Sequence, residues 1–332
     1  MYNNYMIKKL HPELAKSELV ESLPAICGDE TKAVEFFEAQ RWGDSPACPH
    51  CQGKDVYKMT DRDGTRNKRF LWRCRGCGEQ FTVRINTVYE ESRLPLKHWA
   101  YAFWRVCSSK KGASALEIKR HCNISYKSAL FLMHRVRFAI TDDPKNPPPK
   151  LGGTLEVDET YCGGKPRPLD GIISKRGRGT KKTPVVAMVQ RNGDVRTKVV
   201  TAVSHKNLRE FIDLNIEKGS IVNTDSFSMY HTLLWPIYGV GDGRHDVVNH
   251  KAKEYVRRNV DGSLAHVNSC ESFFSLIKRG LIGTFHAVSK EHLPRYCNEF
   301  AFRWNTRTLN DGERITKAVQ SAEGKRLVYR EK

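Results

Sequence analysis

Apolar residues recur with a helical period in the first half of this chain and with strand-like alternation in the second half. Positions 30–42 place Ala33, Phe36, Phe37 and Ala39 toward one side, which predicts a helix. A longer stretch of helical spacing follows Pro95 and runs to about position 140. We therefore expect a helical first half and an α/β second half.

The segment 96–140 divides into three predicted helices. The first begins at Leu96, and two more, over 114–122 and 126–140, are separated by a short break. These proportions are those of a helix-turn-helix, whose second helix enters a DNA groove. We expect that helix to expose a basic face formed by Lys127, His134, Arg135 and Arg137. An ordinary helical hairpin with solvated basic residues is the alternative interpretation.

Strand-like alternation begins at Thr154. Strands are predicted over 154–161, 185–190 and 195–203, and Asn192-Gly193 between the last two is a hairpin signal. An amphipathic helix over 207–218 and strands over 220–224 and 247–249 follow. A β-β-β-α-β order with one carboxylate on the first strand and another just after the fourth is the ribonuclease H-like arrangement. The predicted fold class is α/β (α+β), with a mixed five-stranded sheet in this domain.

The charge balance of the chain points to a polyanionic partner. It has 56 Lys and Arg against 37 Asp and Glu, a formal net charge of +19. Such an excess is expected of a protein that binds nucleic acid, and double-stranded DNA is the predicted partner. The chain has no apolar run of about 18 residues, so we expect a cytoplasmic, nucleoid-associated protein.

Two CxxC pairs predict a zinc ribbon. They begin at Cys48-Pro49 and at Cys74-Arg75, and short strands are expected around them. Four thiolates satisfy the tetrahedral preference of Zn²⁺, so one structural Zn²⁺ is predicted on Cys48, Cys51, Cys74 and Cys77. The basic residues between the pairs could neutralise DNA phosphates. The alternative is that the zinc only stabilises the fold of the ribbon and that the ribbon binds no ligand.

Three carboxylates are candidates for a catalytic metal site. Asp158 and Asp225 lie on the first and fourth predicted strands, which are adjacent in the ribonuclease H-like arrangement. A helix over 267–278 places on one face Asn268, Glu271, Ser275 and Lys278. Carboxylates suit Mg²⁺ or Mn²⁺, and two such ions can promote an in-line phosphoryl displacement. Glu156 and Glu159, which flank Asp158, are expected on the other face of the sheet.

A glycine-rich basic loop joins the first two strands of this domain. Its cations include Lys175, Arg176, Arg178, Lys181 and Lys182. Because the loop follows the strand that carries Asp158, it could clamp DNA beside the carboxylates. A solvated, disordered loop is the alternative.

The chain resembles bacterial insertion-sequence transposases of the DDE class, in the group with an N-terminal zinc ribbon. The resemblance rests on a set of short motifs: Val157-Asp158-Glu159-Thr160-Tyr161, Gly163-Gly164-Lys165, Thr224-Asp225-Ser226, His266-Val267-Asn268, Glu271-Ser272-Phe273-Phe274-Ser275 and Lys278-Arg279-Gly280. It implies a metal-binding triad of Asp158, Asp225 and Glu271, holding two Mg²⁺ or Mn²⁺ ions, with Lys278 beside it. Some members of the group use asparagine in the third place, so Asn268 is a second candidate ligand.

The resemblance implies a DNA transposase. Such an enzyme would bind the terminal inverted repeats of an insertion sequence and catalyse metal-dependent strand cleavage and transfer. It would act on element ends and target DNA as a dimer or larger homo-oligomer. Two alternatives are a DNA-binding regulator derived from a transposase and a ribonuclease H-like nuclease without strand transfer.

These patterns together predict six segments. They are an N-terminal helical segment (1–43), the zinc ribbon (44–90), the helix-turn-helix region (91–141), a proline-rich linker (142–150), the ribonuclease H-like catalytic domain (151–310) and a basic C-terminal helix or tail (311–332).

Overall fold

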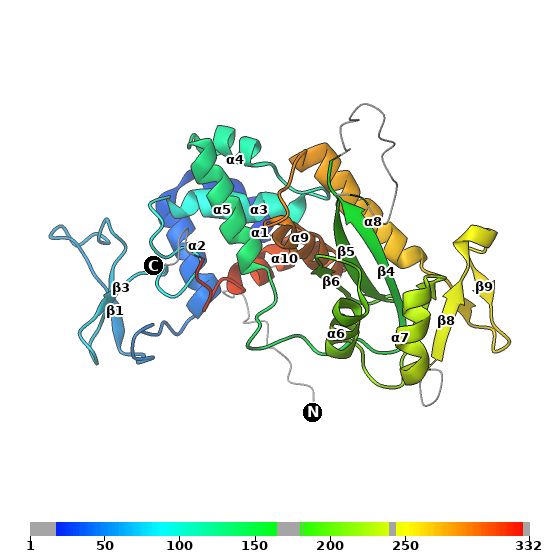
Figure 1. The fold of residues 1–332 in the computed structure, drawn as a ribbon. Helices are drawn as coiled ribbons and strands as arrows, with labels where there is room; N and C mark the ends of the chain where they lie inside the picture. The colour runs from blue at the N-terminus through cyan, green and yellow to red at the C-terminus, as the bar shows by residue number, and fades with distance from the viewer. Residues whose placement is uncertain (1–17, 165–179, 181, 239–243, 328–332) are drawn as a thin grey trace. The chain divides into compact units, whose positions relative to one another are not determined.

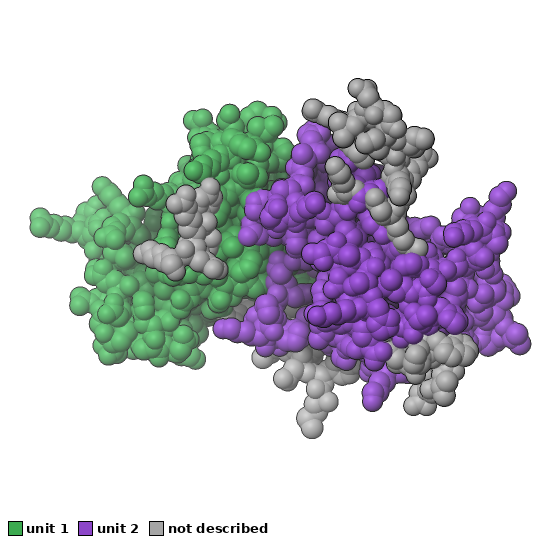
Figure 2. All heavy atoms as spheres, in the orientation of Figure 1, with its two compact units in different colours: residues 1–140, 308–332 green, residues 141–307 purple. Residues whose placement is uncertain are grey.

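The computed structural model describes residues 18–164, 180, 182–238 and 244–327. The chain divides into two compact units, which are coloured separately in Figure 2. Unit 1 comprises Met1–Ile140 and Thr308–Lys332, and unit 2 comprises Thr141–Arg307. Among the described residues, no helix combines the length and the apolar character needed to cross a membrane.

Unit 1 is a helical core that carries a small sheet. Its helices are α1 (Glu18–Gly28), α2 (Glu30–Trp42), α3 (Leu96–Ser108), α4 (Ala115–Cys122), α5 (Tyr126–Ala139) and α10 (Asp311–Gln320). Phe37 of α2 and Phe103 of α3 pack edge to face against the buried ring of Tyr89. The Tyr89 hydroxyl donates to the carbonyl of Val319 in α10. The last helix is therefore part of the same core as the first ones.

The zinc ribbon is an antiparallel sheet in the order β1-β2-β3, drawn in Figure 1. Its strands are β1 (Val56–Lys58), β2 (Trp72–Cys74) and β3 (Gln80–Phe81). Trp72 and Phe81 pack against Trp42 at the end of α2. The Trp72 indole also donates to Glu38 of α2, over 2.7 Å. An aromatic cluster and a buried hydrogen bond thus hold the ribbon on α2.

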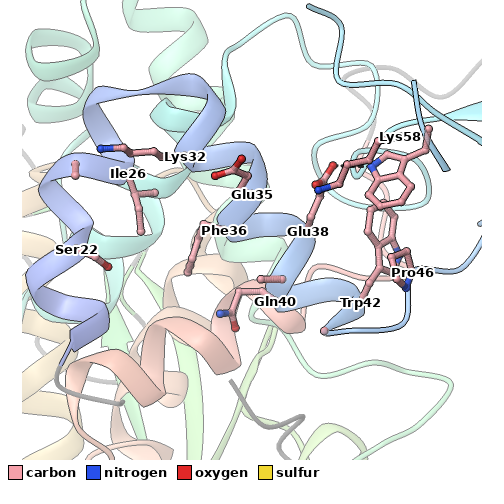
Figure 3. A pocket seen from close by; sticks show the side chains of 14 residues that line it. Ser22, Ile26, Lys32, Glu35, Phe36, Glu38, Gln40, Trp42, Pro46 and Lys58 are labelled. Carbon is pink, nitrogen blue, oxygen red and sulfur yellow. Dashed lines mark hydrogen bonds between the residues drawn. The ribbon is translucent and has the colours of Figure 1, made fainter. Parts of the chain in front are cut away.

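A hollow of about 530 Å³ runs along α2 in unit 1 (Figure 3). It extends from Ser22 and Ile26 of α1 to Trp42 and to Lys58 of the ribbon. At the ribbon end of the hollow, the Lys58 ammonium lies 5.4 Å from the centre of a Trp72 ring, in a cation–π contact.

Helices α4 and α5 form the predicted helical pair. Asn123, in the left-handed conformation, ends α4, and the Ser125 hydroxyl caps α5 by accepting from the Ser128 amide. Lys127 is exposed, as predicted. The expected exposure of His134, Arg135 and Arg137 is wrong, because their exposed fractions are 5%, 5% and 1%. Segments distant in sequence cover this side of α5: Arg135 donates to the carbonyls of Glu90 and Leu327.

Unit 2 is built on a five-stranded mixed sheet in the order β6-β5-β4-β7-β8. Its strands are β4 (Thr154–Cys162), β5 (Thr183–Gln190), β6 (Val195–Val199), β7 (Ile221–Asp225) and β8 (Arg244–Val248). The first three strands are antiparallel, and β7 pairs in parallel with both β4 and β8. The predicted α/β class, the mixed sheet and the adjacency of the first and fourth strands are confirmed.

Helices cover both faces of this sheet (Figure 1). One core packs α6 (His205–Asn215) and α7 (Ser228–Tyr238) against strand residues that include Val157 and Val222. The other packs α8 (Asn268–Gly280) and α9 (Leu293–Asn305) against residues that include Ala187 and Val189. Residues of β4 therefore alternate between the two helical layers.

Smaller elements complete unit 2 around α8. A 3₁₀ turn, η1 (His250–Ala252), and the antiparallel strands β9 (Arg257–Arg258) and β10 (Leu264–Ala265) lie between β8 and α8. After α8 the chain continues as a π-helical turn, η2 (Leu281–Phe285).

Candidate functional site

The four cysteines of the ribbon lie close together. Their Sγ atoms are all within 4.8 Å of one another, the one group among the described residues in which three or more metal-ligand atoms come this close. Sγ distances are 3.7 Å from Cys48 to Cys77 and 3.6 Å from Cys51 to Cys74. Tetrahedral Zn²⁺ with bonds of about 2.3 Å would place its sulfurs about 3.8 Å apart. The set therefore fits Zn²⁺.

The backbone of the ribbon favours the thiolate form of Cys74, one of these four residues. The pKa of the Cys74 thiol is lowered to about 7, and the largest cause is a hydrogen bond from the Cys77 backbone. Gly78, with a φ of 76°, forms the turn of the second pair and donates its amide to the Cys74 carbonyl. A left-handed residue is needed there, which explains the glycine. His50 is exposed and lies outside the cluster.

Asp158 and Asp225 occupy equivalent positions on adjacent strands. Val157 of β4 pairs with Thr224 of β7, so each aspartate is the residue that follows this pair. Because β4 and β7 are parallel, the two side chains project toward the same face of the sheet. Asp158 also lies opposite Ala187 of β5, whose side chain belongs to the core under α8. Both aspartates therefore face the α8 layer.

Glu271 of α8 lies near enough for its charge to act on Asp158. Burial, and then the charges of Glu159, Asp225 and Glu271, raise the pKa of Asp158 well above its usual value. This crowding of like charges is what a divalent cation would relieve, and hard carboxylate oxygens are the ligands that Mg²⁺ and Mn²⁺ prefer. The three carboxylates are spread more widely than the cysteines. Two ions about 4 Å apart would span such a group.

The exposed face of α8 carries the predicted residues in a row. Asn268, Glu271, Ser275 and Lys278 are all exposed. The Glu271 carboxylate lies 3.7 Å from His250 Nδ1 of η1. His250 therefore borders the third carboxylate, a neighbour that no motif in the sequence indicated.

Glu156 is the residue that sequence reasoning placed wrongly. It does not lie on the other sheet face, because residues 156 and 158 are two apart and share a face. Its side chain is 0% exposed, and its Oε2 accepts from the backbone amides of Ser269 at 2.7 Å and Cys270 at 3.2 Å. Val267, the N-cap residue of α8, makes no side-chain cap. Glu156 thus supplies from β4 the cap that α8 lacks.

Two basic side chains also border the Glu156 carboxylate. Arg191 donates to Glu156 Oε1 over 2.9 Å, and His266 Nδ1 lies 3.1 Å from the same oxygen. Arg191 binds the carbonyls of Leu264 and His266 as well. The N-terminus of α8, one turn before Glu271, is therefore fastened to the strand that carries Asp158.

Glu159 lies on the opposite face, as predicted. The Tyr230 hydroxyl of α7 donates to Glu159 Oε2 over 2.9 Å. Glu159 is therefore engaged on the α7 side of the sheet, although its charge still acts on Asp158.

Lys278 lies toward the end of β4. Burial raises the pKa of the Cys162 thiol to about 11, and the charges of Lys278 and Lys182 oppose that rise. Both lysines are therefore near Cys162. A hollow of about 610 Å³ opens here, with Lys182, His286 and Lys290 in its lining. Lysine side chains thus gather beside the row that carries Glu271.

The residues predicted to contact DNA differ in their exposure to solvent. Lys127 and Lys182 are accessible to some degree, whereas Arg135 and Arg137 are buried and cannot line a groove-binding face. The others, Lys175, Arg176, Arg178 and Lys181, lie outside the described residues.

Comparisons with known proteins agree with this architecture. Residues 150–305 match the family model described as ISXO2-like transposase domain, and residues 28–80 match the transposase zinc-ribbon domain. The chain is 28% identical over 285 residues to an uncharacterized protein in transposable element ISH50 of Halobacterium salinarum. That alignment covers 82% of this chain and 90% of the relative.

A structural likeness is also found to the Mos1 transposase paired-end complex with left transposon end. It has a TM-score of 0.27 and 11% sequence identity, and it covers 64% of this chain and 71% of that chain.

The ribbon, the mixed sheet and the two matched domains define a transposase. A transposase zinc-ribbon domain precedes an ISXO2-like transposase domain in this chain, and the predicted resemblance to insertion-sequence transposases is confirmed.

Proposed function

We propose that this transposase binds the terminal inverted repeats of its insertion sequence and catalyses metal-dependent DNA cleavage and strand transfer. The observation that carries the proposal is the register of Asp158 and Asp225 on adjacent parallel strands, with Glu271 near enough to raise the pKa of Asp158. Carboxylates brought together from two strands and a helix suit phosphoryl transfer better than a structural role, because unrelieved repulsion between them would only destabilise the fold.

In this proposal Asp158, Asp225 and Glu271 hold two Mg²⁺ or Mn²⁺ ions. Such ions, when bound, activate the attacking oxygen and stabilise the leaving oxygen of an in-line displacement. Lys278 lies on the same face of α8 two turns further on and would bind a phosphate of the DNA strand. Glu156 would keep Glu271 in place by anchoring the start of the helix.

DNA recognition is assigned to unit 1. The start of α5 presents the exposed residues Ser125, Tyr126 and Lys127, which suit a helix end that enters a major groove. We further propose that the protein acts as a dimer or larger homo-oligomer on double-stranded DNA, since two element ends must be processed together.

The test is the variant Asp225→Asn on a duplex that ends in the terminal repeat. We expect the rate of cleavage in Mg²⁺ to fall by more than about 100-fold, which exceeds the loss typical of a residue that only supports a metal ligand. The affinity for the duplex should stay within a few-fold of the wild-type value. Retained cleavage would remove the triad assignment. A wild-type chain that binds the repeat without cutting any DNA would favour a regulator, and one that yields free ends without joined products would favour a nuclease.

A further inference from the structure

A basic groove of about 410 Å³ lies in unit 1 between the zinc ribbon and the start of α3. Its lining includes apolar residues such as Val34, Phe70 and Leu96. The cations are on both sides, Lys68 and Arg69 on the ribbon and Arg93 and Lys97 before and at the start of α3. We name it the ribbon groove. Its lining lies entirely in unit 1 and includes no residue of α5.

The ribbon side of the groove is a rigidly held loop. Arg66 is paired with Glu38 of α2, and the Asn67 side chain donates to Asp61 over 2.6 Å. The Phe70 amide donates a hydrogen bond to the Asn67 carbonyl, which closes the turn, and Phe70 has a φ of 56°. Side chains other than glycine rarely adopt this conformation, and it persists only where the surroundings impose it. Lys68 and Arg69 are thus presented outward from a fixed turn.

The acidic residue that lines the groove, Glu30, already accepts hydrogen bonds within unit 1. Glu30 accepts the backbone amides of Leu96 at 2.8 Å and Lys97 at 3.0 Å, and so caps α3 after Pro95. Arg84 lies 3.5 Å from the same carboxylate and donates to the carbonyl of Leu94. One acid and one arginine therefore offset each other at the base of the groove.

Four cations remain without a counter-ion. Within the part of the chain that the structure describes, no ion pair with an acid is formed by Lys68, Arg69, Arg93 or Lys97. Charges of one sign around a concave, partly apolar surface focus the electrostatic potential and attract a polyanion. A surface that served only solubility would more often intersperse both signs.

We propose that the ribbon groove binds the sugar-phosphate backbone of duplex DNA. The inference rests on the proposed function, that the protein acts on DNA, and adds to it a surface that the ribbon and α3 form together. Lys68 and Arg69 would contact phosphates from one side, Arg93 and Lys97 from the other, and Phe70 would lie against the sugars. Contacts of this kind set the position of a protein on a duplex and carry no base sequence.

The salt dependence of binding tests the groove. Fluorescence anisotropy would follow a labelled duplex carrying the terminal repeat, with full-length wild type, Lys68→Gln/Arg69→Gln, Arg93→Gln/Lys97→Gln and the control Lys54→Gln/Arg62→Gln. The control pair has the same charges, is exposed on the same ribbon and lies outside the groove lining. Zinc content and the melting temperature would verify that all four proteins are folded.

We expect each groove variant to reduce the slope of log K against log salt by about 0.9 per lost contact, roughly 1.8 in total, and the control to leave it unchanged. The same loss should appear on a duplex of unrelated sequence. Equal slopes for groove and control variants would overturn the groove while leaving DNA binding in place. A wild-type chain that binds no duplex would instead overturn the proposed function on which the groove depends.

Discussion

The Glu156 carboxylate accepts the backbone amide of Ser269 over 2.7 Å, which joins the middle of β4 to the first turn of α8. Glu156 stands two residues before Asp158, and Ser269 stands two residues before Glu271. Together with the Cys270 amide, which binds the same oxygen, this bond links the segments that carry two of the proposed metal ligands. A carboxylate is also the favourable charge at a helix N-terminus, where backbone amides are unpaired and the helix dipole is positive.

Glu156→Gln is expected to slow catalysis by about 10–100-fold, the usual effect of an outer-shell partner, without weakening DNA binding. The amide offers one acceptor oxygen where the carboxylate offers two, so its NH2 group must face a donor, either the amides of Ser269 and Cys270 or the Arg191 guanidinium. The unfolding free energy should fall by about 1–3 kcal/mol. Single-turnover cleavage and denaturant unfolding would measure the two effects.

Glu299→Gln is the matched control for that variant. Glu299 is also 0% exposed and is paired with Arg303 within α9, away from the start of α8. It should lose similar stability and keep its cleavage rate at a temperature where both proteins are folded. If both variants lost cleavage equally, Glu156 would have only a structural role.

The sheet was readable from the sequence because its signals are local. Alternating apolar residues, the Asn192-Gly193 turn and the two aspartates together predicted the strand order that the structure confirms. Helical spacing likewise predicted the exposed row from Asn268 to Lys278. The strands and this row needed only a period or a short turn motif, whereas the adjacency of the first and fourth strands was taken from the ribonuclease H-like arrangement.

The sequence could not reveal contacts between residues that lie far apart along the chain. Glu156 meets Ser269, 113 residues away, and Arg191, 35 residues away, and such distant partners explain why an acid is buried in β4. Arg135 on α5 was expected to face solvent, but it binds the carbonyls of Glu90, 45 residues earlier, and Leu327, 192 residues later. Helical periodicity gives the direction of a side chain, whereas its exposure depends on what folds over it.

The third metal ligand can be identified by comparing the variants Glu271→Gln and Asn268→Ala. Because Glu271 carries a charge that acts on Asp158, we expect its neutralisation to reduce Mg²⁺-dependent cleavage by more than about 100-fold. Asn268 is exposed one turn earlier, and its loss should cost less than about 10-fold. Cleavage rates over a Mg²⁺ titration would measure both. The reverse order of effects would assign the third ligand to Asn268.

Removal of the zinc should unfold the ribbon and leave the rest of unit 1 folded. Structural zinc supplies the folding energy of small modules, and the ribbon has few buried residues beyond Trp72 and Phe81. Cys74→Ser is expected to abolish zinc binding and to change the fluorescence of Trp42 and Trp72, which pack together. Cys122→Ser, at a buried cysteine outside the cluster, should keep one zinc ion per chain. Zinc retained by Cys74→Ser would contradict the assignment.

Acid should destabilise unit 2 partly through His245. Burial, with a smaller contribution from His231, lowers the pKa of His245 from its usual 6.5 to about 4. The folded state therefore binds fewer protons than the unfolded state between these values, so stability is full above pH 6.5 and decreases as the pH falls toward 4. His245→Asn should flatten this dependence in denaturant unfolding. An unchanged slope would show that His245 is not the group responsible.

Gly280 provides a test of how tightly the end of α8 must pack. A Cβ at this position would lie 2.1 Å from a ring carbon of Phe300 in α9, whereas a Cβ at Gly283 would meet no atom within 4 Å. Gly280→Ala should therefore lower the unfolding free energy by about 1–3 kcal/mol, the usual cost of overpacking, despite the higher helix propensity of alanine. Gly283→Ala should leave it unchanged or slightly raised. Because Lys278 precedes this contact by two residues, the shift of α8 in Gly280→Ala should also reduce cleavage. Equal stability of the two variants would show that α8 and α9 separate there at little cost.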